Sequence, residues 1–370
     1  MKFTCYKNDL MEALQIAIRS VAVKPMNPTL AGIYLNANDR YLEMQANNFS
    51  SAVIVKIPVN TEVSGEVVVV GKKFLDFIRN IPSETINFFG EDAASTFSLE
   101  ADGAKAEFLT LPVMDFPKVK EPETDKSFKI RAIALKELIR STAFATSKND
   151  ERPVFRGCLF ELSGDKVTVV ATDTYRIAIC NGIVRENYED GSFIVPADIL
   201  RGVVSYIDPS DVENYIEIKY SSRQVTFRFN NVYLTARQIE GEFPPYDHLL
   251  DDRDRTAIVE VNKVELRTAI EFVAPMAKET ENNAVRFDVM ADCMNISADS
   301  TESGTASQTI ETNMEGDRLQ IAFNIDYFID AMRTMDSQRM TLEFKDPNRT
   351  VAIREVGREN FVYLVTPVRF

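Results

Sequence analysis

Apolar residues recur at helical spacing near the beginning of each third of the chain. With one threonine among them, the positions are Leu10, Leu14, Ala17 and Val21, then Leu135, Leu138, Ile139 and Thr142, then Leu266, Ala269, Ile270 and Val273. Each pattern is followed by two short apolar stretches joined by a polar turn, which is typical of an antiparallel strand pair. The same order of helix and strands is therefore predicted three times.

Two further markers repeat at nearly the same spacing. Where a strand pattern runs into a short helix pattern, the matching residues are Val70, Val195 and Phe323, which lie 125 and 128 residues apart. Where a strand closes the repeat, they are Phe108, Tyr233 and Tyr363, which lie 125 and 130 residues apart. The markers predict three copies of one α+β domain, with helices on one face of antiparallel sheet.

Polar stretches between the repeats indicate where the domains meet. Residues 117–125 are polar and contain two prolines, and residues 251–255 are a run of charges. Both compositions are typical of linkers. We therefore expect an N-terminal domain over 1–120, a central domain over 127–249 and a C-terminal domain over 251–370.

Length and charge narrow the possible functions. The chain has 370 residues, enough for two or three domains. Its 42 Lys and Arg residues are outnumbered by 56 Asp and Glu residues, which gives a net charge of -14. Most nucleic-acid-binding proteins carry a basic surface, so the negative sign is opposite to what such a protein usually shows. It also disfavours binding to an anionic membrane surface.

Signals of export or membrane insertion are weak in this sequence. The first residues, Met1–Tyr6, contain no apolar signal region, and the longest aliphatic run, Val67–Val70, is far shorter than a spanning helix. The four cysteines, Cys5, Cys158, Cys180 and Cys293, are scattered along the chain without a CxxC motif. This spacing favours reduced thiols. We expect a cytoplasmic protein.

The sequence offers no catalytic motif. It contains neither a GxxxxGK[ST] phosphate loop nor a GxGxxG turn after a strand. His248 is the only histidine, so one chain cannot assemble a histidine triad or a multi-histidine metal site. The acidic clusters do not follow a metal-ligand spacing such as that of a calcium loop. We expect no catalytic residue, no metal and no cofactor, and an enzyme with dispersed carboxylates is disfavoured.

Three segments are unusual enough to be candidates for binding. Lys24–Pro25 follows the first helical pattern and is either a turn or a loop that contacts phosphate. Ala171–Ile177 places an aromatic residue beside a cation after a strand, and it is either a surface turn or a binding site. The chain end, Thr366–Phe370, continues a strand and is largely apolar, so we expect it to pack or to bind a partner.

These segments, with others, resemble a known family. The similar stretches are Met1–Thr4, Lys24–Pro25, Arg152–Gly157, Ala171–Arg176, Gly241–Tyr246, Phe323–Tyr327 and Pro367–Arg369. In this order, and with the threefold repeat, they resemble the bacterial β sliding clamp family, the beta subunits of DNA polymerase III, over essentially the whole chain. The resemblance implies a ring-forming, head-to-tail homodimer of three-domain protomers, with helices on the inner face and antiparallel sheets on the outer face.

The resemblance also implies a non-catalytic processivity factor. The ring would encircle double-stranded DNA without sequence preference and would tether the replicative polymerase by raising its effective concentration. The clamp loader, other polymerases and repair proteins would each insert a short hydrophobic peptide into a cleft between the second and third domains.

The family assigns residues of this chain to three surfaces. Positions that match DNA contacts are Lys24, Lys72, Asn149, Pro153 and Val154. Positions that match the peptide cleft, with Arg176 and Arg369 at its polar edge, are Phe155, Thr172, Thr174, Tyr175, Arg176, Ile177, Pro244, His248, Leu249, Tyr327, Asn348, Thr350, Leu364, Thr366, Pro367, Val368 and Arg369. Positions that match the interface between protomers are Lys73, Phe77, Ala106 and Phe108 of the first domain, and Pro275 and Met276 of the third.

The sequence departs from the family pattern at three places. Thr174–Tyr175 stands where Gly-His is familiar, and Thr366 stands where methionine is frequent. Both changes are expected to alter the shape of the pocket and its peptide preference. Pro153–Val154 replaces a pair of tyrosines found in some members, which bears on one DNA contact.

The charge can be reconciled with a DNA partner. The segments expected to line the hole are net positive, whereas the rest of the chain is strongly acidic; they are 7–24, 72–80, 135–148, 197–206, 263–278 and 325–336. Such a distribution would hold DNA loosely inside and repel it outside. The alternative is an acidic, β-rich interaction scaffold that uses the same cleft and does not bind DNA.

Overall fold

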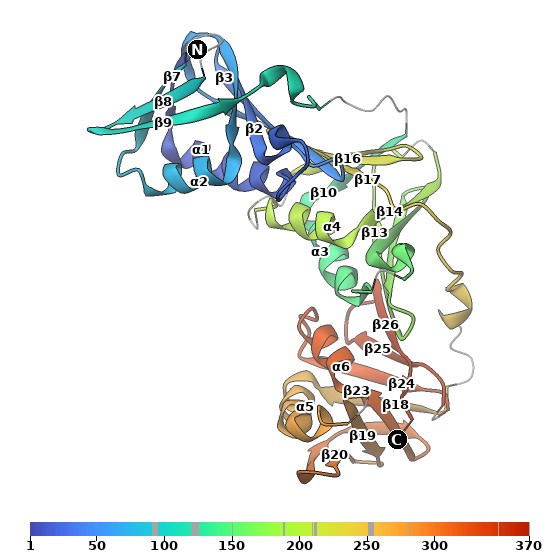
Figure 1. Cartoon of the computed structure of the whole chain (residues 1–370). Helices are drawn as coiled ribbons and strands as arrows, with labels where there is room; N and C mark the ends of the chain where they lie inside the picture. The colour runs from blue at the N-terminus through green and yellow to red at the C-terminus, as the bar shows by residue number, and fades with distance from the viewer. Residues whose placement is uncertain are drawn as a thin grey trace. The chain divides into compact units, whose positions relative to one another are not determined.

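The structure is a computed structural model in which helices pack against antiparallel sheets along the whole chain (Figure 1). It describes residues 1–90, 95–119, 126–149, 151–187, 189–208, 210, 213–250, 255–280, 282–346 and 348–369. Most of the two predicted linkers, residues 120–125 and 251–254, lies outside the described residues.

The first repeat contains two helices and a series of strands. Its elements are β1 (Lys2–Tyr6), α1 (Lys7–Ala17), β2 (Gly32–Asn38), β3 (Tyr41–Asn47), β4 (Ser51–Pro58), β5 (Asn60–Val63), β6 (Gly65–Val70), α2 (Gly71–Asn80), β7 (Thr85–Gly90), β8 (Thr96–Ala101) and β9 (Ala104–Leu111). Short 3-10 turns follow α1 and β9 and precede β2; they are η1 (Ile18–Ser20), η3 (Val113–Asp115) and η2 (Pro28–Ala31).

The second repeat has the same order. Its elements are β10 (Ser127–Arg131), α3 (Ala132–Thr142), η4 (Ala143–Ala145), η5 (Pro153–Arg156), β11 (Gly157–Ser163), β12 (Lys166–Thr172), β13 (Arg176–Ile183), β14 (Gly191–Pro196), α4 (Ala197–Ser205), β15 (Tyr215–Tyr220), β16 (Gln224–Phe229) and β17 (Val232–Arg237).

The third repeat follows the turn η6 (Asp247–Leu250). Its elements are β18 (Ala257–Asn262), α5 (Lys263–Ala277), β19 (Ala284–Val289), β20 (Cys293–Ser300), β21 (Gly304–Glu311), β22 (Asn313–Gly316), β23 (Leu319–Asn324), α6 (Ile325–Met332), β24 (Arg339–Phe344), β25 (Val351–Glu355) and β26 (Phe361–Val365). The predicted α+β class with three copies of one plan is confirmed.

Residue contacts divide the chain into two compact units that cut across the second repeat. One unit, residues 1–132, 185–188 and 205–238, holds a 13-stranded sheet in the order β10-β15-β16-β17-β4-β3-β2-β6-β9-β8-β7-β1-β5. The other unit, residues 133–184, 189–204 and 239–370, holds a nine-stranded sheet in the order β14-β11-β12-β13-β26-β25-β24-β18-β22 and a four-stranded sheet in the order β21-β20-β19-β23. Neighbouring repeats therefore share sheets, through β17 beside β4 and β13 beside β26.

The repeat extends into the cores of the domains. The fourth residue of the second helix is Phe74 in the first repeat, Leu200 in the second and Phe328 in the third, and each is 0% exposed. The Phe74 ring lies 6.0 Å from that of Phe88, and the Phe328 ring lies 5.0 Å from that of Phe287. Full burial of one such side chain stabilises a fold by about 1.5–3 kcal/mol, so the position fixes each helix on its sheet.

The helices end earlier than the sequence pattern predicts. Helix α1 ends at Ala17, α3 ends at Thr142 and α6 ends at Met332, and 3-10 turns continue the chain after the first two. The Thr142 hydroxyl donates to the carbonyl oxygen of Leu138 at 2.7 Å, an internal bond that is common where a helix finishes.

Part of the positive charge expected on the segments that line the hole lies outside the helices. Within their observed bounds, the six α-helices of the described chain carry nine basic and nine acidic residues, whereas the longer segments are net positive. The basic excess of the longer segments comes from residues that follow the helices, namely Arg19, Lys24, Lys148, Lys278 and Arg333. Arg19, Lys278 and Arg333 follow a helix within two residues, where the negative end of the helix dipole favours a cation.

Candidate functional site

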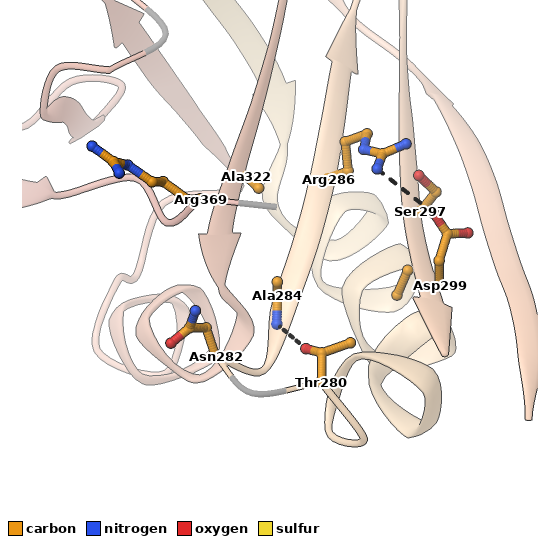
Figure 2. Close-up of a pocket in the computed structure, with 9 residues that line it drawn as sticks. Thr280, Asn282, Ala284, Arg286, Ser297, Asp299, Ala322 and Arg369 are labelled. Atoms are coloured by element: carbon orange, nitrogen blue, oxygen red, sulfur yellow. Dashed lines mark hydrogen bonds and ion pairs between the residues drawn. The ribbon is translucent and has the colours of Figure 1, made fainter. Parts of the chain in front are cut away.

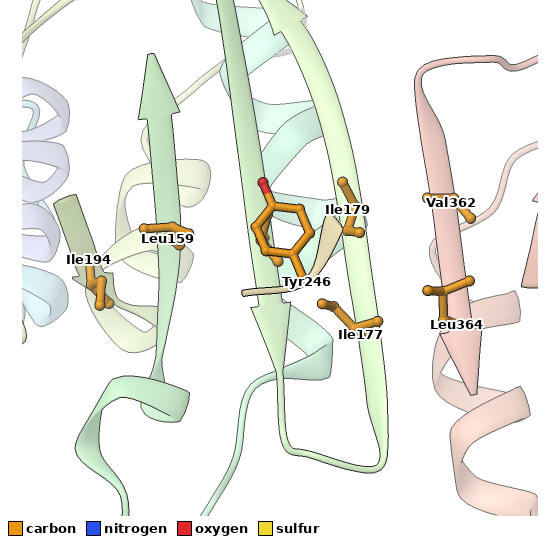
Figure 3. Packing of buried hydrophobic residues seen from close by; sticks show 8 residues of the cluster. Leu159, Ile177, Ile179, Ile194, Tyr246, Val362 and Leu364 are labelled. Atoms are coloured by element: carbon orange, nitrogen blue, oxygen red, sulfur yellow. The ribbon is translucent and has the colours of Figure 1, made fainter. Parts of the chain in front are cut away.

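One face of the nine-stranded sheet carries an apolar cluster (Figure 3). Its members come from β11, β12, β13, β14, β26 and the segment before η6, and they are Leu159, Val170, Ile177, Ile179, Ile194, Tyr246, Val362 and Leu364. Partly buried residues pack against it, namely Val154, Ile239, Phe243, Leu250 and Ala352. Because β13 pairs with β26, the second and third repeats contribute to one apolar surface.

The segment 239–250 lies along this apolar cluster. The Ile239 N–H donates to the Ile194 carbonyl at 2.9 Å, and the Tyr246 hydroxyl donates to the Glu161 carboxylate. Burial, together with this hydrogen bond, raises the pKa of Tyr246 well above its usual value. Figure 3 shows the Tyr246 ring against the sheet between Leu159 and Ile179. The segment after β17 is therefore fixed in place before it reaches the third repeat.

The loop Thr172–Arg176, between β12 and β13, is held by its own side chains. The Thr172 hydroxyl donates to the Arg176 carbonyl at 2.6 Å and accepts from the Thr174 N–H at 3.1 Å. Asp173 Oδ1 accepts from the N–H groups of Tyr175 and Arg176, each at 3.1 Å. These local bonds set the loop without help from a partner.

Arg176 lies in the interior of the second unit. Its Nε donates to Asp173 Oδ2 and its Nη1 donates to Asp330 Oδ2, both at 2.9 Å, and its side chain is only 7% exposed. The guanidinium also stands 4.7 Å from the centre of the Tyr327 ring. The structure therefore places Arg176 beneath the loop, with its donors occupied, rather than at an exposed polar edge.

The departure at Thr174 has a backbone consequence. Thr174 has a φ of 82°, in the left-handed region that glycine occupies without strain. A β-branched residue is an outlier there, which accounts for the glycine that is familiar at this position. The neighbouring Tyr175 is 60% exposed, so its ring is available on the surface beside the loop.

The end of the chain runs from this loop to a second surface. The Thr366 N–H donates to the Tyr175 carbonyl at 2.9 Å, and the Val368 N–H donates to the Ala322 carbonyl at 2.8 Å. Arg369 then lines a pocket of about 330 Å³ together with Arg286, and Figure 2 shows the two on opposite sides of Ala322. Arg369 therefore belongs to this pocket on the third repeat and not to the apolar cluster.

The remaining positions expected at the cleft lie around the apolar cluster in two groups. Phe155 is buried and meets Phe243 edge to face at 6.2 Å, whereas Pro244, His248 and Leu249 of the segment 239–250 are exposed. In the turn between β24 and β25 lie Asn348 and Thr350, beside the tail residues Thr366 and Pro367. Of the seventeen positions, only Ile177 and Leu364 are core members of the cluster.

The positions that match DNA contacts fall in both units. Lys24 and Lys72 are exposed in the first unit, and neither makes an ion pair within the described residues. Asn149 and Pro153 are exposed in the second unit. Val154 differs from them, because it is half-buried and packs against the apolar cluster.

The interface positions of the first repeat lie side by side on α2 and β9. The Phe77 ring is 52% exposed and meets the Phe108 ring edge to face at 5.2 Å. Lys73 is exposed and Ala106 is half-buried. The β9 strand pairs with β6 only at Thr110 and Leu111, so its earlier residues present an open edge on that side.

The third repeat has a matching open edge that the sequence reading missed. Pro275 is exposed and Met276 is half-buried near the end of α5, where Phe272 is 59% exposed. The β21 strand ends the four-stranded sheet and has no second strand partner among the described residues. An exposed phenylalanine in a helix is a signal that sequence could have offered, but the open strand edge depends on the pairing of the whole sheet.

Membrane-spanning helices and clusters of metal-ligating side chains are both absent from the described residues. None of their helices has the length and apolar character to cross a membrane. Nor do their His, Cys, Asp and Glu side chains gather in a group of three or more that could hold a metal ion.

Three α+β repeats that share sheets with their neighbours, and an apolar cluster where the second and third repeats meet, define a protein of the DNA sliding clamp class. Family models of the DNA polymerase III beta subunit match the chain in succession, the N-terminal domain over residues 1–120, the central domain over 129–245 and the C-terminal domain over 252–369. The chain belongs to the DNA polymerase III beta subunit family.

Curated relatives and solved structures agree with this assignment. The Beta sliding clamp of Vibrio cholerae is 25% identical over 377 residues and that of Staphylococcus aureus is 24% identical over 378, with 99–100% of each chain covered. The solved sliding clamp of Bacillus subtilis superposes with a TM-score of 0.94 at 25% identity. The match covers 100% of this chain and 99% of the Bacillus subtilis chain. The predicted function, a non-catalytic clamp that serves as a polymerase processivity factor, is confirmed.

Proposed function

We propose that two copies of this chain join head to tail into a ring that encircles double-stranded DNA in the cytoplasm. The observation that carries the proposal is the threefold repeat itself, in which each copy adds two helices to antiparallel sheet and shares that sheet with its neighbour. A ring holds DNA by topology, so strong base or phosphate contacts are not needed. Helices without net charge are suited to such loose contact.

The open edges of β9 and β21 support a head-to-tail interface. Two unpaired strand edges from different ends of the chain can pair with each other across two protomers, and such a heterologous contact closes into a ring. Exposed Phe77 and Leu109 beside one edge, and Phe272 near the other, would become buried. Lys73, Ala106, Phe108, Pro275 and Met276 are the further positions proposed for this interface.

Loose DNA contact is assigned to Lys24, Lys72, Asn149 and Pro153. Lys24 and Lys72 are exposed cations without ion pairs in the described chain, so phosphates meet no competing carboxylate there. Val154 is removed from this group because its side chain packs against the apolar cluster.

We further propose that the apolar cluster binds short hydrophobic peptides of the replicative polymerase, the clamp loader, other polymerases and repair proteins. Tyr175, His248 and Leu249 are exposed around it, and the tail residues Thr366–Val368 border it. Aliphatic and aromatic peptide side chains would extend the buried surface. A clamp of the same fold from Pseudomonas aeruginosa has been solved with griselimycin bound.

Retention on circular DNA tests the ring. We expect a particle of about twice the 41.8 kDa chain mass that, once placed on a closed plasmid by its loader and ATP, stays bound until the plasmid is linearised. Phe77→Asp should give monomers and abolish retention, whereas the matched control Tyr41→Asp, at an exposed aromatic residue on β3, should do neither. Equal release from circular and linear plasmid would refute the ring.

A peptide experiment tests the cleft. A fluorescein-labelled Ser-Leu-Ser-Leu-Phe-Ser peptide should lose at least about ten-fold in affinity when Tyr175→Ser and Leu249→Asp are combined. The control Tyr6→Ser, at a residue that is 65% exposed, should bind the peptide normally. Equal binding by both variants would contradict the cleft. A variant with Lys24→Gln and Lys72→Gln should keep its peptide affinity and dissociate faster from DNA. This result would distinguish the clamp from a scaffold that does not bind DNA.

A further inference from the structure

The loop Asn47–Ser51, between β3 and β4, repeats the backbone design of the loop Thr172–Arg176. Asn47 and Thr172 are 125 residues apart and occupy the same position after a strand. The Asn47 side chain accepts from the Phe49 N–H at 2.8 Å, as the Thr172 hydroxyl accepts from the Thr174 N–H. Phe49 has a φ of 67° and Thr174 has a φ of 82°. The two loops therefore turn in the same way.

The next residue of each loop also has the same role. Asn48 Oδ1 accepts from the N–H groups of Ser50 and Ser51 at 3.0 and 2.8 Å. Asp173 Oδ1 does the same for Tyr175 and Arg176 in the other loop. The match is thus one of hydrogen bonds as well as of sequence position.

The strand beside each loop is also equivalent. The Arg237 N–H, at the end of β17, donates to the Ser50 carbonyl at 2.9 Å. The Thr366 N–H, just after β26, donates to the Tyr175 carbonyl at the same distance. Ser51 is paired with Ala236 as Arg176 is paired with Val365. The first unit therefore contains the counterpart of the surface that we propose for peptides in the second.

A pocket of about 350 Å³ occupies this place in the first unit. It is lined by Asn47, Phe49, Ser50, Ser51, Ala52, Lys118, Val119, Gln224, Thr235, Ala236 and Arg237. The large apolar residues of the other site are replaced by small or polar ones, since Ala52 stands where Ile177 stands and Thr235 stands where Leu364 stands. Phe49 is the one large apolar side chain that lines the pocket, so this surface is more polar than the hydrophobic cleft.

The charge of the lining points to a different ligand. Lys118 and Arg237 both line the pocket, and none of its described lining residues carries a carboxylate, although the whole chain carries -14. Arg237 is exposed and makes no ion pair within the described residues. Lys118 Nζ forms an ion pair with Glu66 Oε2 at 2.8 Å and stands 4.7 Å from the centre of the Tyr34 ring. Glu66 therefore compensates part of the Lys118 charge, and the exposed Arg237 is the cation that favours a carboxylate-bearing ligand.

We propose that this pocket is a second docking site, for an acidic, extended peptide segment of a partner protein. An extended peptide fits because the same turn and strand edge form the site that we assign to peptides in the second unit. A nucleic acid fits less well, because two cations neutralise few phosphates and the acidic chain repels a long polyanion. The proposal goes beyond the hydrophobic cleft and does not require that the cleft bind anything.

Paired peptides test the second site. A fluorescein-labelled peptide of alternating Asp and Ser, eight residues long, is compared by anisotropy with the Asn and Ser version at low salt. We expect the Asp peptide to bind at least about ten-fold more tightly, and Arg237→Gln to lower its affinity about ten-fold. Arg223→Gln is the matched control, because Arg223 is exposed near β16 but does not line the pocket.

The outcomes separate this proposal from the hydrophobic cleft. The cleft variant with Tyr175→Ser and Leu249→Asp should leave the Asp peptide bound as tightly as before. The proposal is overturned if the Asp and Asn peptides bind equally or not at all, or if Arg237→Gln and Arg223→Gln have the same effect. It is also overturned if a short DNA duplex displaces the Asp peptide at equal concentration, since the site would then be one for nucleic acid.

Discussion

The loops Asn47–Ser51 and Thr172–Arg176 share a backbone and differ in what lies beneath them. The fifth residue of one is Ser51, whose hydroxyl is 3.1 Å from that of Ser20. The fifth residue of the other is Arg176, held between the carboxylates of Asp173 and Asp330. Because each loop satisfies its own N–H groups with the side chains of its first two residues, the backbone does not depend on the interior. A repeated scaffold can therefore carry two different surfaces.

Removing Arg176 should give the largest effect on this comparison. Arg176→Ala leaves Asp173 and Asp330 without their buried partner, which typically costs about 3–5 kcal/mol, and the partial exposure of Asp330 favours the lower end. Ser51→Ala removes the neutral hydrogen bond with Ser20 and a longer one to Asn48 Oδ1 at 3.4 Å, and it should cost about 1 kcal/mol. The free energy of unfolding in urea measures both. Equal losses would mean that the two interiors contribute alike.

The tyrosines of the two surfaces should respond differently to alkaline pH. Burial and the bond to Glu161 raise the pKa of Tyr246, whereas Lys118 partly opposes the same effects of burial and Glu66 on Tyr34. Above about pH 10 an unfolded tyrosine loses its proton while the folded one retains it. The unfolded state then binds fewer protons, so stability is complete below that pH and falls as the pH rises.

The slope of stability against pH measures this difference. Tyr246→Phe should reduce the fall above about pH 10 by about 1.4 kcal/mol per pH unit, and Tyr34→Phe should reduce it less. Urea unfolding over this range gives both slopes. Buried thiols such as Cys158, whose pKa is raised to about 12 by burial, add a further decrease in stability with rising pH. All variants share this decrease. A larger change in slope for Tyr34→Phe than for Tyr246→Phe would contradict this prediction.

Glycine substitutions at the two left-handed residues should give the smallest effect. Thr174→Gly relieves a β-branched residue at φ 82° and should stabilise the protein by about 1 kcal/mol after the entropy of glycine is subtracted. Phe49→Gly relieves less strain at φ 67° and should be close to neutral. Thermal unfolding of the two variants, side by side, provides the measurement. A destabilised Thr174→Gly would show that its side chain contributes more than its backbone costs.

Much of the fold was predictable because it is local. Helix periodicity and strand pairs are properties of neighbouring residues, and the same local patterns recur about 125 residues apart. Together they predicted three α+β repeats that the structure confirms. Ile177 and Leu364 of the apolar cluster are among the positions that the resemblance to the family assigns to the peptide cleft. The domain boundaries and the assignment of residues to DNA, peptide and protomer stay predictions.

What was missed depends on which strands become neighbours. Arg176 was expected at the polar edge of the cleft, and its burial was not foreseen, because its second carboxylate, Asp330, is 154 residues away in the chain. The helices end before the segments that were expected to line the hole, so basic residues of those segments such as Lys24 and Lys148 lie beyond the helices. Neither result follows from a local pattern.

The sequence by itself determined the repeat, the class of the domains, the resemblance to the family and the position of the candidate segment Ala171–Ile177. Only the tertiary structure decided that Arg176 is buried, that Val154 faces the apolar cluster, and that Lys118 and Arg237 share a pocket whose described lining residues include no carboxylate. The reason is physical. Periodicity records which face of an element is buried, but the charge and polarity of a site depend on side chains that meet only when β17 pairs with β4 and β13 pairs with β26.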